Sequence, residues 1–223
     1  MAIAIYGAGG CALDLAPLVC EATGIEPLIV SDHGPQTLDD VPLSYSVLVA
    51  VAHPATRRKM VAKVEARGLR FASVFPPSCI RRGPSDIGEG AMFHDYTMVT
   101  ANARIGRHCL VNLYSYIAHD CIVGDFVTLS PRVCINGNVI VEDEVFFGTG
   151  AIIANGTPHK PLRIGKGAFI GMGALVTKDV PAGKRVYPDR RQASSTLMRF
   201  HVPEPARSVV TQPVPEKPAA VRL

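Results

Sequence analysis

Residues 105–124, IGRHCLVNLYSYIAHDCIVG, carry a large apolar side chain at every sixth position. An α-helix repeats every 3.6 residues and an isolated strand every two, so neither produces this spacing. A β-helix with three short faces per coil does, because each face of six residues points one apolar side chain at the axis. The stretch therefore predicts a β-helix whose coils each take three such units, 18 residues in all.

The six-residue spacing extends in both directions from this stretch. It runs unbroken from Ile87 to Ile153 and resumes at Ile164, after a loop that contains Pro158 and Pro161. Most residues four places after each large one are small, and glycine often follows the large one directly. Strands of a β-sandwich do not keep one register over such a length, which excludes that fold. The predicted axial residues are Ile87, Phe93, Val99, Ile105, Val111, Ile117, Val123, Leu129, Ile135, Val141, Phe147, Ile153, Ile164, Ile170 and Val176.

Residues 1–80 follow a different pattern, in which short apolar runs alternate with helical ones. Strand and helix in alternation indicate a small parallel sheet, about half of a dinucleotide-binding fold of the Rossmann type. We therefore expect an α/β domain over residues 1–80 and the β-helix over residues 81–192. The expected strands are 3–6, 27–30, 47–51 and 71–74, and the expected helices follow Gly10 and span 54–67.

The composition is that of a globular protein. Apolar residues make up 48% of the 223, enough for a sizeable core. No apolar run has the length of a membrane span, and residues 1–6 lack the basic start of a signal peptide, so we expect a cytoplasmic protein without a membrane segment.

The six cysteines form no C-x-x-C pair, which favours reduced core residues over disulfides or a zinc site. Residues 193–223 end in an aperiodic, proline-rich stretch and are expected to form a flexible tail.

The positive charge is concentrated in one late segment. The net charge of +4 is too small to indicate general nucleic-acid binding. Between Thr157 and Gln192, however, eight Lys and Arg residues stand against two acids, whereas the rest of the chain holds 15 against 17. The late segment therefore suits an anionic ligand.

The repeat resembles that of the left-handed β-helix, or hexapeptide-repeat, acyltransferases. The glycine-rich turn at residues 7–10 and the segment Ile117–Asp125, IAHDCIVGD, make the chain similar to bacterial nucleotide-sugar N-acetyltransferases and to the closely related sialic acid O-acetyltransferase family. The resemblance covers about residues 3–192. Its left-handed winding departs from the usual right-handed crossover rule.

The resemblance implies an activity and an assembly. Members of the family transfer an acetyl group from acetyl-CoA to the amine of a nucleotide-linked amino sugar, here of the 4-amino-4,6-dideoxyhexose type, for surface lipopolysaccharide or other polysaccharide. Their sites straddle two subunits of a homotrimer. The chain's partners would then be a nucleotide-linked amino sugar, coenzyme A and further copies of itself.

His119 and Asp120 are the catalytic residues that the resemblance implies. A neutral imidazole, with an ordinary pKa near ~6.5, suits a general base that removes the proton from the attacking sugar amine. Asp120 would orient the imidazole, although adjacent strand residues normally point apart unless they lie at a corner. The alternative role of His119 is that of a solvated histidine on a coil face.

Family members sometimes place a second histidine where this chain has Thr128, so any role of that position in CoA anchoring is in doubt.

The turn after the first strand imitates a dinucleotide fingerprint. Glycine lets the backbone approach a phosphate, and the following helix supplies N–H groups and positive potential. The domain is too short for both halves of a dinucleotide site, so a mononucleotide diphosphate fits better. In the resembled family this loop and the acidic residue after the second strand, here Asp32, hold the nucleotide of a UDP-, dTDP- or GDP-sugar, and an asparagine at the position of Asn112 often lies beside the substrate. The alternative role of Asp32 is a loop cap, and that of Asn112 is a corner hydrogen bond. The predicted substrate-binding residues are Gly7, Ala8, Gly9, Gly10, Asp32 and Asn112.

The basic segment suits coenzyme A, which carries a diphosphate and a 3′-phosphate. For any single lysine, a solvated surface charge is the alternative. In the family the pantetheine arm follows the groove between neighbouring β-helices. By their positions in the coils, Gly137, Gly148, Thr149 and Gly171 are predicted to line this groove. The predicted cofactor-binding residues are Gly137, Gly148, Thr149, Lys160, Lys166, Gly171 and Lys178.

Two other functions remain open from the sequence. The same base and thioester would serve O-acetylation of a sugar hydroxyl, for example on a sialic acid. A catalytically silent β-helix, acting as a scaffold or a nucleotide sensor, belongs to a different class. Binding of acetyl-CoA and the identity of the acceptor separate these functions.

Overall fold

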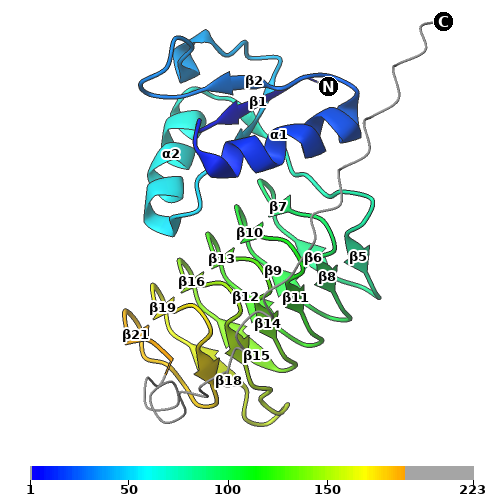
Figure 1. The fold of residues 1–223 in the computed structure, drawn as a ribbon, viewed down its shortest axis with the longest axis vertical. Helices are drawn as coiled ribbons and strands as arrows, with labels where there is room; N and C mark the ends of the chain where they lie inside the picture. Colours follow the sequence, from blue (N-terminus) through cyan, green and yellow to red (C-terminus); the bar gives the residue numbers. More distant parts are fainter. Residues whose placement is uncertain (1, 189–223) are drawn as a thin grey trace, which may run out of the picture. The chain divides into compact units, whose positions relative to one another are not determined.

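The computed structural model describes residues 2–188, and the predicted tail at 193–223 lies outside them. The chain begins with a four-stranded parallel sheet in the order β2-β1-β3-β4, of which Figure 1 labels β1 and β2. Its elements are β1 (Ile3–Tyr6), α1 (Gly10–Thr23), β2 (Leu28–Val30), the short 3-10 helix η1 (Leu38–Asp40), β3 (Ser46–Val49), α2 (Pro54–Ala66) and β4 (Arg70–Phe71).

Local sequence explains both helices. α1 ends at Gly24, whose φ of 68° lies in the left-handed region that glycine adopts without cost. α2 begins with Pro54 at its first turn, and the preceding His53 side chain accepts the N–H of Thr56. The predicted alternation of strands and helices is confirmed in this part.

The fourth predicted strand, 71–74, is wrong in its extent. β4 ends at Phe71, and Val74 instead pairs with Met92 in the next part of the chain. The Val74 N–H donates to the Ala91 carbonyl at 2.9 Å, and the Phe93 N–H donates to the Val74 carbonyl at 3.0 Å. An apolar alternation shows that a segment is extended and half-buried, but not which sheet receives its hydrogen bonds.

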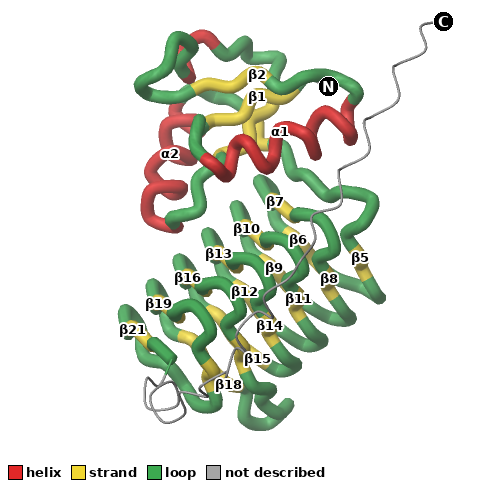
Figure 2. The backbone as a smooth tube through the Cα atoms, viewed as in Figure 1, coloured by secondary structure: helices red, strands yellow, loops and turns green. Residues whose placement is uncertain are grey.

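The remainder forms three parallel sheets of two- and three-residue strands joined by tight turns (Figure 2). Successive coils pair in a register of 18 residues, as where Leu110 stands opposite Thr128. The first sheet contains β7 (Met92–Phe93), β10 (Leu110–Val111), β13 (Thr128–Leu129), β16 (Phe146–Phe147), β19 (Phe169–Ile170) and β21 (Arg185–Val186). The second contains β5 (Ile80–Arg81), β8 (Met98–Val99), β11 (Tyr116–Ile117), β14 (Cys134–Ile135), β17 (Ile152–Ile153) and β20 (Leu175–Val176). The third contains β6 (Asp86–Ile87), β9 (Arg104–Ile105), β12 (Ile122–Val123), β15 (Val139–Val141) and β18 (Leu162–Ile164).

The predicted axial series is confirmed as the core of this β-helix. Its members from Phe93 to Val176 are buried together, with Ile87 packed against them at the first coil. The small residues four places later, such as Cys109 and Ala151, are also buried, because the corners leave no room for larger ones.

The turns of the β-helix share one backbone conformation. The residue three places after an axial residue has a φ between 54° and 61° at nine non-glycine positions, among them Asn102 and Asp120. We call the corner between the first and second sheets the first edge, that between the second and third sheets the second edge, and that between the third and first sheets the third edge. Each left-handed residue lies at one of these edges.

A buried arginine joins the α/β part to the β-helix. Arg57 of α2 is fully buried, and its Nε donates to the His108 carbonyl at 2.8 Å. Its Nη1 donates to the Val51 carbonyl at 2.6 Å, and its Nη2 donates to the Phe126 carbonyl at 2.9 Å and to Thr128 Oγ1 at 2.9 Å. Thr128, where relatives of the resembled family sometimes carry histidine, is therefore part of this junction.

Met92 and Leu110 of the first sheet complete an apolar cluster with residues of β1 and α1. Burial of these side chains fixes the α/β part on that sheet. Across residues 2–188, no helix is both long enough and apolar enough to cross a bilayer.

Candidate active site

His119 and Asp120 lie together on the second edge, between β11 and β12. Asp120 has a φ of 57°, and this corner conformation turns its carboxylate back toward its neighbour. Asp120 Oδ2 lies 2.7 Å from His119 Nδ1, and Asp120 Oδ1 accepts from Asn102 Nδ2 at 3.0 Å. The bond to His119 first, and then the bond to Asn102, hold the pKa of Asp120 below its usual value. The expected objection, that adjacent residues point apart, does not apply at this corner.

This arrangement leaves one imidazole nitrogen free for chemistry. When Nδ1 donates its proton to Asp120, Nε2 keeps a lone pair and can accept a proton. The His119 side chain is 59% exposed, so a substrate can reach it. The pair therefore has the form of an oriented general base.

Gly137 makes room for the imidazole on the next coil. A Cβ added at Gly137 would lie 2.6 Å from both Cε1 and Nε2 of His119. The sequence predicts that Gly137 lines the cofactor groove, and the structure places it against the Cε1 and Nε2 side of the His119 ring. Any larger residue at this position would force the imidazole to move.

Replacing Gly137 with alanine is expected to lower kcat by about 10-fold to 100-fold, because the new methyl group displaces the imidazole by a fraction of an ångström to an ångström. The Michaelis constants for both substrates should change little, since the backbone of Gly137 keeps its conformation. Steady-state kinetics with a melting curve for each protein measure this. Wild-type kcat in a folded Gly137→Ala variant would contradict the assigned contact.

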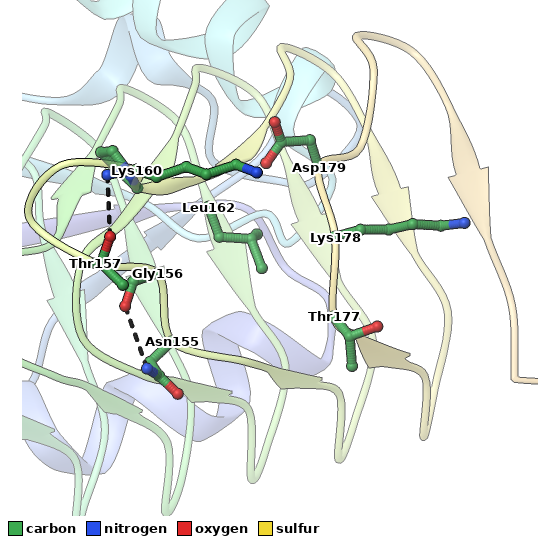
Figure 3. Close-up of a pocket in the computed structure, with 9 residues that line it drawn as sticks. Asn155, Gly156, Thr157, Lys160, Leu162, Thr177, Lys178 and Asp179 are labelled. Carbon is green, nitrogen blue, oxygen red and sulfur yellow. Dashed lines mark hydrogen bonds between the residues drawn. The ribbon is translucent and has the colours of Figure 1, made fainter.

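A cleft with a volume of about 520 Å³ lies farther along the same edge (Figure 3). The loop between β17 and β18 forms one wall as a small hairpin, closed by hydrogen bonds of 3.0 and 3.1 Å between Thr157 and Lys160. The Gly156 N–H donates to the Gly137 carbonyl at 3.0 Å, so the cleft begins on the coil after Gly137. The lining residues are Asn155, Gly156, Thr157, Lys160, Pro161, Leu162, Thr177, Lys178 and Asp179.

Two predicted cofactor lysines border this cleft from different turns. In Figure 3 the Lys160 side chain extends across the opening toward Asp179, whereas Lys178 points away from the hairpin. Both ammonium groups can move to meet a phosphate, because flexible stems carry them. His119, Gly137, Lys160 and Lys178 therefore share the second edge.

The other predicted cofactor residues lie on different edges of the β-helix. Gly148, Thr149 and Gly171 follow strands of the first sheet and occupy the first edge. Lys166 stands on the third edge, where its Nζ lies 3.3 Å from Asp143 Oδ2. One copy of the chain therefore does not bring all the predicted cofactor residues into one site.

Asn112 also occupies the first edge. Its Oδ1 accepts the N–H of Leu113 at 2.8 Å, which is the corner hydrogen bond considered as its alternative role. This bond leaves the Asn112 amide nitrogen to contact other groups.

The glycine-rich turn lies where the order of the α/β sheet reverses, between β1 and β3. Open parallel sheets bind ligands at this switch point, beyond the carboxyl ends of the strands. Gly7 has a φ of 129°, and a Cβ there would lie 2.7 Å from the Ala50 carbonyl oxygen, so glycine is required. Gly9 caps α1 without a side-chain hydrogen bond, and Cβ atoms at Gly9 or Gly10 would meet open space. Ala8, Gly9 and Gly10 are exposed whereas Gly7 is buried, so the accessible part of the turn is residues 8–10.

Asp32 is held by two partners that the sequence did not indicate. Tyr6 Oη donates to one carboxylate oxygen, and Lys63 Nζ donates to the other at 2.7 Å. Lys63 first, and then Tyr6, hold the pKa of Asp32 below its usual value. The three side chains line a cleft of about 410 Å³ together with η1 and the end of α2. Asp32 thus offers fixed acceptor oxygens beside a fixed cation.

Comparisons with known proteins give relatives named as an N-acetyltransferase and as O-acyltransferases of nucleotide sugars, although no family model matches the chain. GDP-perosamine N-acetyltransferase from Escherichia coli O157:H7 is 42% identical over 135 residues, which are 60% of this chain and 61% of that protein. The structure of WeeI from Acinetobacter baumannii AYE matches with a TM-score of 0.77 and 38% identity, covering 84% of this chain and 96% of that one. PerB from Caulobacter crescentus, solved in complex with CoA and GDP-perosamine, matches with a TM-score of 0.73 and 25% identity, covering 84% of this chain and 94% of that one.

These similarities extend over both parts of the chain. They confirm the predicted fold, a small parallel-sheet domain followed by a left-handed parallel β-helix. They also confirm the resemblance that the six-residue repeat, the glycine-rich turn and the His-Asp pair carried. The chain belongs to the hexapeptide-repeat family of nucleotide-sugar N-acetyltransferases.

Proposed function

We propose that the protein transfers an acetyl group from acetyl-CoA to the amine of a nucleotide-linked amino sugar. The main observation in support of this activity is that the His119–Asp120 pair lies on the same edge as a cleft bordered by Lys160 and Lys178. The names of the relatives, a GDP-perosamine N-acetyltransferase and a protein solved with CoA and GDP-perosamine, support this choice of substrates.

In the proposed reaction the unprotonated amine attacks the thioester carbonyl, forming the new C–N bond. His119 Nε2 accepts the proton that the nitrogen loses, while Asp120 holds the Nδ1 proton and stabilises the imidazolium. Backbone N–H groups of the coil stabilise the oxyanion. The C–S bond then breaks, and the proton returns from His119 to the leaving thiolate. The products are an acetamido sugar nucleotide and free CoA.

The cofactor phosphates are assigned to the basic residues of the late segment. Lys160 and Lys178 would bind them at the second edge, and Lys166 would do so from the third edge. Phosphate recognition by lysine depends on charge rather than on a fixed geometry, which suits these exposed side chains.

A homotrimer completes the proposal, because it brings different edges of neighbouring copies together. The outward-facing side chains of the second sheet are apolar, and Leu175 is 65% exposed in the single chain. An uncovered apolar sheet face of this kind favours self-association. Packing there would place Asn112, Gly148, Thr149 and Gly171 of one copy near the second edge of another. The residues of the second sheet that face outward are Ile80, Met98, Tyr116, Cys134, Ile152 and Leu175.

The nucleotide is assigned to the α/β part. The open backbone of Gly9 and Gly10 at the start of α1 suits the diphosphate, and Asp32 with Lys63 suits the polar edge of a base. We place the step in the cytoplasm, as part of surface-polysaccharide synthesis, where both substrates are available.

The experiment offers the purified protein acetyl-CoA together with GDP-, dTDP- and UDP-linked 4-amino-4,6-dideoxyhexoses, and with their 4-hydroxy counterparts. Thiol release and product mass are measured. We expect one acetyl group to be added to at least one amino sugar and none to its hydroxyl counterpart. Transfer only to hydroxyls would establish O-acetylation instead. If no thiol is released and acetyl-CoA does not raise the melting temperature, the chain is a scaffold or a sensor.

A further inference from the structure

Asn102 stands one coil before Asp120, in the equivalent corner position. The two residues are 18 apart and share the left-handed conformation, with φ values of 61° and 57°. Asn102 Nδ2 donates to Asp120 Oδ1 at 3.0 Å, and the other oxygen of Asp120 lies 2.7 Å from His119 Nδ1. The three side chains therefore form a continuous chain of hydrogen bonds along the second edge.

The backbone holds Asn102 and Asp120 in place. The Asn102 N–H donates to the Pro84 carbonyl at 2.7 Å, and the Asp120 N–H donates to the Ala101 carbonyl at 3.0 Å. The Asp120 side chain itself is 46% exposed, so its hydrogen bonds help to keep the carboxylate from turning toward water. A donor fixed on one oxygen directs the other oxygen at the imidazole.

We propose that Asn102 is a positioning residue for the acetyl transfer, because it holds Asp120 in the orientation that keeps the His119 proton on Nδ1 and Nε2 free. The proposal rests on the function proposed above. A neutral amide suits this role: it supplies a directed donor without a charge that would compete for His119. The lowered pKa of Asp120, to which Asn102 contributes, is consistent with it.

A second role for Asn102 can be tested in the same experiment. Asn102 and Asp120 also line a cleft of about 400 Å³ with Asp86 and Arg104, on the side of His119 away from Lys160. If Asn102 contacts the acceptor there, its loss should raise the acceptor KM and leave kcat unchanged. If it positions Asp120, its loss should lower kcat and leave both Michaelis constants unchanged.

The first variant is Asn102→Gly, which removes the amide and keeps the left-handed backbone without strain. We expect kcat to fall about tenfold, the size of effect typical of residues that orient a functional histidine, with both KM values within twofold of the wild type. The matched control is Glu144→Gly. Glu144 occupies the same turn position with a φ of 59°, but on the third edge, and should keep wild-type kinetics.

The second variant is Asn102→Asp, which puts a carboxylate beside Asp120. Like charges at this distance raise the pKa of the pair, so Asp120 takes up a proton at a higher pH than in the wild type. A protonated Asp120 no longer accepts the Nδ1 proton, so activity is lost earlier as the pH falls. The acidic limb of the kcat/KM profile should move up by about one pH unit.

A measurement without substrates separates this proposal from the proposed function. Nitrogen NMR of the His119 ring should show the Nδ1–H tautomer in the wild type and a mixture of tautomers in Asn102→Gly. That result supports positioning even if the acceptor proves to be a hydroxyl. An unchanged tautomer together with wild-type kcat, or a raised acceptor KM with unchanged kcat, would overturn the positioning role.

Discussion

Replacing His119 with alanine is expected to lower kcat by about 10²–10⁴-fold, with little change in the KM for the nucleotide sugar. The reason is geometric: Asp120 fixes the Nδ1 proton at 2.7 Å, and Nε2 is then the group placed to accept the amine proton. The His119 side chain is 59% exposed and does not belong to the axial core, so its removal should leave the melting temperature nearly unchanged. Kinetics with saturating acetyl-CoA measure the effect.

The control for this prediction is a histidine elsewhere on the β-helix. His159 is exposed on the hairpin between β17 and β18, and His159→Ala should keep kcat near the wild-type value. Comparable losses in the two variants would indicate a general effect of removing imidazoles. Normal turnover by a folded His119→Ala variant would remove His119 from the mechanism.

The second large effect is expected at Arg57. Arg57→Met should lower the free energy of unfolding by about 3–5 kcal/mol, because it removes a buried guanidinium and leaves the carbonyls of His108, Val51 and Phe126 without their donors. Burial lowers the pKa of Arg57 to about 10, so the guanidinium remains charged at neutral pH and its hydrogen bonds are charge-assisted. Urea denaturation measures the change through the midpoint and the slope.

The neighbouring arginine provides a matched control. Arg58 is 58% exposed and lies 3.3 Å from Glu144, an arrangement worth at most about 1 kcal/mol at a surface. Arg58→Met should therefore unfold at nearly the wild-type urea concentration. Equal stabilities for the Arg57 and Arg58 variants would show that the buried contacts do not hold the two parts together. Arg57→Lys should recover little stability, since an ammonium cannot reach all the acceptors of the guanidinium.

Part of the candidate site could be predicted from the sequence, because the β-helix is periodic. Counting by 18 residues places Asn102 beside Asp120 and Gly137 beside His119, as the structure shows. The same count separates Asn112 and Gly148 from His119, so the division of the predicted cofactor residues among the edges was also foreseeable. The positions of Lys160 and Lys178 could not be counted in this way, because the loop between β17 and β18 interrupts the repeat of 18 residues. After this loop Ile152 pairs with Leu175 and not with the residue 18 places later.

The six-residue spacing of large apolar side chains determined the β-helix by itself, because only that backbone brings every sixth residue to one axis. Strand and helix alternation likewise determined the parallel sheet of the first part. Tertiary structure alone decided that Arg57 joins the two parts and that Lys63 and Tyr6 hold Asp32. These contacts join elements that no repeat relates, so their partners depend on how whole surfaces pack rather than on any spacing along the chain.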